Sequence, residues 1–172
     1  MQLLLSSTSF AYQLDMNHQY QITIDKPIDY IMELFLNQDN FKHWQKGLIS
    51  FDNLTSTVGE KGSKRRLKIK TLVGTVSMVE EIIERDLPHH WKATYRTKGV
   101  LNMQSNRFRE SEKTTDQKTI KQTVWDATSE FKFTGMMRLV AKAKPDLFEQ
   151  QTYQFMKDFK SFAEDGTSVA GN

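Results

Sequence analysis

The side chains best suited to acid–base or metal chemistry are scattered along this sequence. Its 172 residues include four histidines and no cysteine, which excludes thiolate catalysis, disulfides and cysteine-held metal centres. His89 and His90 are adjacent, and adjacent strand residues point to opposite faces, which is poor spacing for a shared metal. Glu80, Glu81 and Glu84 do not form the carboxylate pair that acid–base chemistry needs. We therefore predict no metal site, no cofactor and no motif-defined catalytic residue.

Arg65 is the charged residue that a solvated surface explains least well. It shares strand alternation with Leu67 and Ile69, so its guanidinium either points inward or reaches water from the strand end. An inward guanidinium would need a carboxylate partner, such as Glu80 or Glu110, and would offer a forked donor to a ligand. Of the two arrangements we favour the solvated one.

A basic run between residues 61 and 70 alternates charged and apolar side chains. Lys64, Arg66, Lys68 and Lys70 form the solvated face of one predicted strand, with no aromatic residue interleaved for stacking on bases. The formal net charge of +3 is also small. We predict no nucleic-acid partner; a weak, salt-sensitive attraction to phosphates or acidic membranes stays open.

The ends of the chain lack the features of targeting or membrane segments. The apolar run Leu3–Leu5 is too short for a signal peptide or a span, so we predict no stable membrane insertion. We expect residues 1–16 to be a loosely attached extension or an added edge strand, 17–165 to be one domain, and 166–172 to be a disordered tail. The lack of cysteine fits a cytoplasmic location.

The elements that must position these residues are mostly strands. Alternation predicts a strand over His18–Ile24, and Pro27 then opens a helix that ends near Leu36, followed by a second short helix at Phe41–Trp44. Six further strand segments are predicted around residues 49–51, 63–72, 75–85, 90–98, 101–112 and 119–133. Hairpin-connected strands flanked by helices indicate the α+β class with a mostly antiparallel sheet.

The longest predicted helix covers Pro145–Glu164. Its apolar seam, spaced by four and three residues, consists of Phe148, Thr152, Phe155, Phe159 and Phe162. A helix this aromatic needs a broad apolar partner, which the sheet supplies. The helix is expected to pack as core and to close one side of a pocket.

This order of elements resembles the helix-grip fold of the SRPBCC superfamily, which includes START domains, polyketide cyclases and heat-shock ATPase activator-like proteins. The resemblance covers roughly residues 17–165. Within the superfamily, the chain is similar to an uncharacterised bacterial branch. The stretches that carry it are 22–31, 40–44, 99–102, 106–108, 131–137, 148–152 and 156–160. It implies a curved antiparallel sheet of about seven strands, wrapped around the C-terminal helix, with a cavity between them.

Large apolar side chains and a few polar ones are the candidates for lining that cavity. On an unbroken strand Met103 and Phe108 have opposite parity, so one of them points away. Asn102 is a further polar candidate. The ligand-binding residues that we predict are Trp44, Arg65, Met78, Trp91, Tyr95, Asn106, Phe108, Trp125, Met137, Phe148 and Phe155.

Three functions are open on this basis. The first is binding or carriage of a small apolar ligand, such as a lipid, a quinone or a polyketide-like ring, in the cavity. The second is a cyclase- or dehydratase-type enzyme in the same cavity, which needs Glu80, Glu110 or Asp126 inside it. The third is a protein-interaction module like the heat-shock ATPase activators, which needs an exposed apolar patch.

Overall fold

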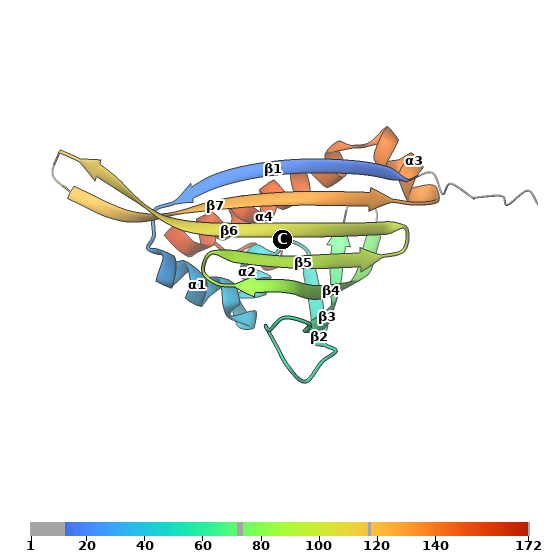
Figure 1. Cartoon of the computed structure of the whole chain (residues 1–172), viewed down its shortest axis with the longest axis horizontal. Helices are drawn as coiled ribbons and strands as arrows, with labels where there is room; N and C mark the ends of the chain where they lie inside the picture. The colour runs from blue at the N-terminus through green and yellow to red at the C-terminus, as the bar shows by residue number, and fades with distance from the viewer. Residues whose placement is uncertain (1–12, 72–73, 117, 172) are drawn as a thin grey trace, which may run out of the picture.

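The computed structural model describes residues 13–71, 74–116 and 118–171, and it consists of one antiparallel sheet with helices packed on one of its faces (Figure 1). The strands are β1 (Leu14–Ile24), β2 (Leu48–Asn53), β3 (Lys64–Thr71), β4 (Gly74–Asp86), β5 (His90–Thr97), β6 (Val100–Thr115) and β7 (Lys118–Phe133). The helices are α1 (Ile28–Leu36), the 3-10 helix η1 (Gln38–Asn40), α2 (Phe41–Trp44), α3 (Met136–Ala143) and α4 (Asp146–Asp165). The predicted α+β class and the two short helices after the first strand are confirmed.

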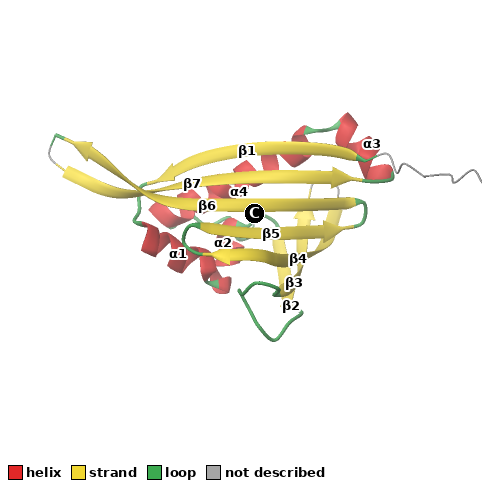
Figure 2. Cartoon of the chain, in the orientation of Figure 1, coloured by secondary structure: helices red, strands yellow, loops and turns green. Residues whose placement is uncertain are grey.

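The sheet has seven strands in the order β1-β7-β6-β5-β4-β3-β2. Hairpins join β2 through β7 in sequence, so each strand pairs antiparallel with the next. The first strand pairs with the last, while α1, η1 and α2 carry the chain to the opposite edge (Figure 2). This topology curves one sheet around the helices, as the helix-grip resemblance implies.

The first strand begins earlier than its sequence pattern indicates. β1 starts at Leu14, which pairs with Phe133, and the register continues without interruption to Ile24 opposite Thr123. Residues 14–16 therefore belong to the sheet. For these residues the structure agrees with the predicted alternative of an added edge strand. Residues 1–12 lie outside the part of the chain that the structure describes.

The segment after α4 is hydrogen-bonded to the short helix α2, so the predicted disorder is wrong for its described residues. The backbone N–H of Val169 donates to the carbonyl of His43 at 3.0 Å. The His43 Nδ1 also lies 2.8 Å from the hydroxyl of Ser168. These contacts anchor residues 168–169 on the helical side of the domain.

The long helix buries a line of side chains slightly rotated from the predicted seam. The fully buried positions facing the sheet are Thr152, Met156, Phe159 and Ala163, whereas Phe148, Phe155 and Phe162 lie half-buried beside them. Asp158, which the pattern placed on the solvated side, is also buried, and its Oδ1 accepts a hydrogen bond from Gln154 at 2.7 Å. The helix ends at Gly166, whose φ of 71° suits a glycine cap.

An aromatic cluster forms the core between α1, α2, α4 and the sheet. Phe35 of α1 lies at its centre, and its ring centroid is 5.3 Å from that of Phe108 and 5.8 Å from that of Phe159. Three tryptophans complete the cluster: Trp44, Trp91 and Trp125. Such rings bury large apolar areas and hold the sheet and α4 apart at this end of the domain.

Among the helices that the structure describes, none is both long and apolar enough to cross a membrane.

Candidate ligand-binding cavity

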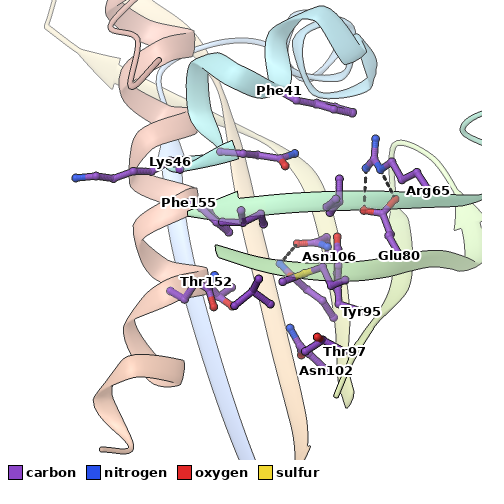
Figure 3. A pocket seen from close by; sticks show the side chains of 18 of the residues that line it. Phe41, Lys46, Arg65, Glu80, Tyr95, Thr97, Asn102, Asn106, Thr152 and Phe155 are labelled. Carbon is purple, nitrogen blue, oxygen red and sulfur yellow. Dashed lines mark hydrogen bonds and ion pairs between the residues drawn. The ribbon is translucent and has the colours of Figure 1, made fainter. Parts of the chain in front are cut away.

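A cavity of about 800 Å³ lies between the inner face of the sheet and α4. Its volume falls within the roughly 300–1,000 Å³ of small-molecule sites. Residues of β2 to β7 and of all the described helices line it, and Figure 3 shows Phe155 and Thr152 on α4 opposite polar residues of the sheet. The apolar part of the wall includes Leu67, Ile69, Val76, Met78, Ile82, Trp91, Val100, Met137, Val140, Leu147, Phe148 and Phe155. Side chains alone therefore do not fill the space between sheet and helix.

A charged pair, Arg65 with Glu80, is set into the sheet wall of this cavity (Figure 3). The two residues are directly opposite on β3 and β4, and the Arg65 Nε lies 2.7 Å from the Glu80 Oε1 while its Nη2 donates to Oε2 at 2.8 Å. The Arg65 guanidinium also lies 4.3 Å from the centre of the Phe41 ring. The favoured solvated arrangement for Arg65 is therefore wrong, and the alternative with Glu80 as partner is the one observed.

Tyr95 completes a polar cluster with that pair. It faces Glu80 across β4 and β5 in the strand register, and the Glu80 carboxylate acts electrostatically on its hydroxyl. Burial raises the pKa of the Tyr95 hydroxyl well above its usual 10.0, the Glu80 charge raises it further, and the Arg65 charge opposes the rise. The hydroxyl thus stays protonated at physiological pH and keeps its oxygen available as an acceptor.

The alkaline stability of the protein provides a test of this environment. Because the pKa of the Tyr95 hydroxyl is higher in the folded than in the unfolded state, its protonated form stabilises the folded state below pH 10. This stabilisation is lost as the pH rises through the folded-state pKa. Above pH 10 the free energy of unfolding should fall more steeply for the wild type than for Tyr95→Phe, by up to about 1.4 kcal/mol per pH unit. Urea unfolding between pH 9 and 11 measures both slopes. Parallel slopes would contradict the buried hydroxyl facing a carboxylate.

Amide side chains of β6 form a second polar strip on the same wall. Asn102, Gln104 and Asn106 alternate along β6 and all border the cavity. The Asn106 Oδ1 accepts hydrogen bonds from the Trp125 indole at 2.9 Å and from the Gln104 amide at 3.4 Å. Asn106 therefore satisfies a buried indole, and the amide nitrogen of Gln104 is engaged with Asn106.

A hydroxyl pair joins the sheet to α4 beside the cavity. The Ser129 Oγ of β7 lies 2.8 Å from the Thr152 Oγ1 of α4, and both side chains are buried. Since each hydroxyl satisfies the other, this contact fixes the helix on the sheet at the point where the apolar stripe of α4 is interrupted by a polar residue.

Nearly all of the predicted ligand-binding residues lie around this space. All of them except Phe108 line the cavity, and Phe108 is buried in the aromatic core against Trp125, with ring centroids 5.3 Å apart. The placement of Phe108 in the site is a correction: its parity is inward, as expected, but neighbouring rings cover it. Contact of the other residues with a ligand stays a prediction.

Two polar residues of the cavity wall, Gln104 and Thr152, were not among the predicted ligand-binding residues, although the sequence pattern contains a signal for each. Gln104 lies between Asn102 and Asn106 on the same alternating strand face, so the pattern that named its neighbours applies to it equally. Thr152 belongs to the predicted helix seam, but its contact with Ser129 depends on how α4 packs on β7. Glu80 was a candidate acid, and it alone of the three candidates is inside: Glu110 is exposed and Asp126 faces Arg109 outside the cavity.

The histidines do not gather into a metal site, and the described residues contain no group of three or more potential ligands. His90 begins β5 and contacts Ser105 at 2.9 Å and Glu84 at 3.4 Å, so it is partly enclosed by neighbouring strands and does not lie in a fully solvated turn.

A curved sheet, a long C-terminal helix gripped by it and a cavity between them together define a helix-grip fold. Neither a protein-family model nor a curated protein sequence matches the chain. Solved structures do match it over most of its length, at identities that demonstrate the fold alone.

Three of these structures illustrate the range of the similarity. Norcoclaurine synthase from Thalictrum flavum, in complex with dopamine and hydroxybenzaldehyde, has a TM-score of 0.61 at 14% identity, covering 94% of each chain. Ara h 8.0201 has a TM-score of 0.62 at 11% identity, covering 87% of this chain and 98% of its own. A conserved protein from Geobacillus kaustophilus has a TM-score of 0.58 at 12% identity, covering 86% and 95%.

Proposed function

We propose that this protein binds and carries a small, neutral and mostly apolar molecule between its sheet and α4. The observation that supports this most directly is the cavity of about 800 Å³, whose wall is mainly apolar but holds a few polar groups on the sheet side. Burial of apolar ligand surface would drive binding, at about 25 cal/mol per Å² before entropic costs. Lipids, quinones and polyketide-like rings have this character.

The polar cluster supports a neutral ligand over an anionic one. Arg65 already has both carboxylate oxygens of Glu80 as partners. The other basic residues of the lining are exposed: Lys46, Lys64, Lys70, Arg85 and Lys98. A ligand carboxylate would have to displace Glu80 from Arg65 and leave a buried carboxylate without its cation, which is costly. The Tyr95 oxygen and the Gln104 carbonyl are acceptors, so the ligand that fits best carries a hydroxyl or another neutral donor beside its apolar body.

Native mass spectrometry of the purified protein tests this proposal. The expected spectrum shows a stoichiometric small mass that is lost on denaturation, and extraction of the denatured sample would then identify the molecule. A spectrum of bare protein, together with no saturable binding of the neutral probe N-phenyl-1-naphthylamine, would contradict the proposal.

A second candidate function is catalysis in the same cavity, and the inward position of Glu80 favours it. The carboxylate is 2% exposed and faces a tyrosine across the strand pair, an arrangement that can hold and move a proton. Once the bound molecule is known, incubation with wild type and Glu80→Gln distinguishes the two functions. An enzyme converts the molecule and loses this conversion in the variant, while a carrier returns it unchanged from both.

Two further expectations have weaker support. A protein-interaction role needs a continuous apolar patch, but the exposed large apolar side chains are distributed over α1, the β2 region, α3 and α4. We also propose a cytoplasmic location, which the lack of cysteine favours.

A further inference from the structure

The short helix α3 covers one end of the cavity. Its Met137 and Val140 line the cavity, and its Ala141 is buried. The β5–β6 turn fixes its start, because a Cβ on Gly99 would lie 2.9 Å from the Met137 Cγ and the Thr134 N–H donates to the Gly99 carbonyl at 2.9 Å. The inner side of α3 is thus part of the cavity wall.

The outer side of the same helix is apolar and exposed. Met136 is 75% exposed and Leu139 is 53% exposed, the first and third highest values among the exposed large apolar residues of the described chain. Residues three apart share one face of a helix, so the two side chains form a single outward pair. An eight-residue helix that is apolar on both sides has one side without a partner in this domain.

Basic residues flank this outward pair in the sequence. Between Phe131 and Pro145 the chain has four basic residues and no acidic one, and acidic residues resume with Asp146 at the start of α4. Lys142 and Lys144 are exposed at the C-terminal end of α3, whereas the exposed Lys132 lies on β7 opposite Asp15. Exposed apolar side chains beside lysines on a short helix match the interfacial region of an anionic bilayer, where apolar groups enter below the phosphates and lysines bind them.

We propose that α3 docks peripherally on anionic lipid membranes, with Met136 and Leu139 entering the interface and Lys142 and Lys144 at the headgroup phosphates. This contact lies on the surface and does not require a spanning helix. Docking does not depend on a ligand, but it would place the α3 end of the cavity beside the bilayer.

Flotation with vesicles of phosphatidylcholine, with or without 30% phosphatidylserine, tests the proposal. We expect the full chain to bind the anionic vesicles, and added salt to weaken the binding. Met136→Gln with Leu139→Gln, and separately Lys142→Gln with Lys144→Gln, should each lower the partition coefficient at least fivefold. The matched controls are Ile49→Gln, an apolar residue of β2 that is 57% exposed, and Arg66→Gln with Lys68→Gln on the basic face of β3.

The outcomes separate docking from ligand binding. Absence of binding to anionic vesicles, or loss of binding in the β3 pair but not in the α3 variants, overturns the proposal. Equal binding to neutral vesicles overturns it as well, because the lysines then contribute nothing. Titration of each variant with N-phenyl-1-naphthylamine reports the cavity independently, so vesicle binding can fail while the proposed carrier function stands.

Discussion

Glu80→Ala is expected to lower the free energy of unfolding by about 3–5 kcal/mol, the range seen when one partner of a buried ion pair is removed. The physical reason is the Arg65 guanidinium, whose side chain is 13% exposed and whose carboxylate partner is Glu80. Without the carboxylate, the guanidinium either stays in the wall unpaired or swings outward and gives up its contact with Phe41. Urea unfolding at neutral pH, with the denaturant slope compared between variants, measures the change.

The double variant Arg65→Met with Glu80→Met is the matched control. Replacing a whole buried ion pair with apolar residues of similar volume is often neutral or stabilising, so this variant should recover most of the loss. A loss below about 1 kcal/mol in Glu80→Ala, or an additive loss in the double variant, would show that the pair behaves as a solvated surface contact.

Gln104→Trp is expected to weaken binding of N-phenyl-1-naphthylamine at least tenfold, which corresponds to about 1.4 kcal/mol. Gln104 is half-buried in the middle of β6 and borders the cavity, so an indole at this position occupies space that a ligand would need. It also removes one of the two neutral acceptors that we assign to ligand recognition. Fluorescence titration of the probe measures the affinity of each protein.

Met103→Trp provides the control, because adjacent residues of a strand point to opposite faces. Met103 is the neighbour of Gln104 on β6 and does not border the cavity, so its replacement should leave the probe affinity within about twofold. Thermal melting would show that both variants are folded. Equal effects of the two substitutions would place the probe elsewhere on the molecule.

The sequence predicts much of the fold because its local patterns agree with the tertiary structure. Alternation along 63–72 and 119–133 identifies β3 and β7, and Pro27, Pro145 and Gly166 lie at helix ends in the structure as expected. The predicted apolar seam of α4 differs from the observed buried line by a small rotation about the helix axis. Asp158 was misplaced because a carboxylate on an otherwise polar helix face gives no local sign that the neighbouring elements cover it.

The site was predictable in its members but not in its pairings. Strand parity left an inward Arg65 open while the solvated arrangement was favoured, and the observed pairing with Glu80 depends on the register of the β3–β4 hairpin, where Thr71 faces Gly74. A shift of that register by two residues would give Arg65 a different neighbour. For Phe108, strand alternation correctly gave the inward direction of the side chain. The aromatic rings packed around it place it in the core and not at the cavity wall.

The ligand itself could not be predicted because an apolar wall accepts many apolar molecules. Met78, Met137 and Phe155 offer adaptable contacts without directional preference. Only the polar groups narrow the choice, and they do so through geometry that depends on several strands at once. For this reason the sequence indicates a cavity-forming fold, and the contacts of Arg65, Glu80 and Tyr95 supply the argument for a neutral ligand.

The central claim, that a small apolar molecule binds between the sheet and α4, is tested most directly by NMR of methionine methyl groups during titration with N-phenyl-1-naphthylamine. Met78 and Met137 line the cavity, whereas Met136 is on the outer side of α3 and Met103 on the outer face of β6. The account predicts saturable shifts of the Met78 and Met137 methyl resonances with Met136 and Met103 unmoved. Shifts confined to Met136 and Met103, or no saturable shift at all, would contradict it.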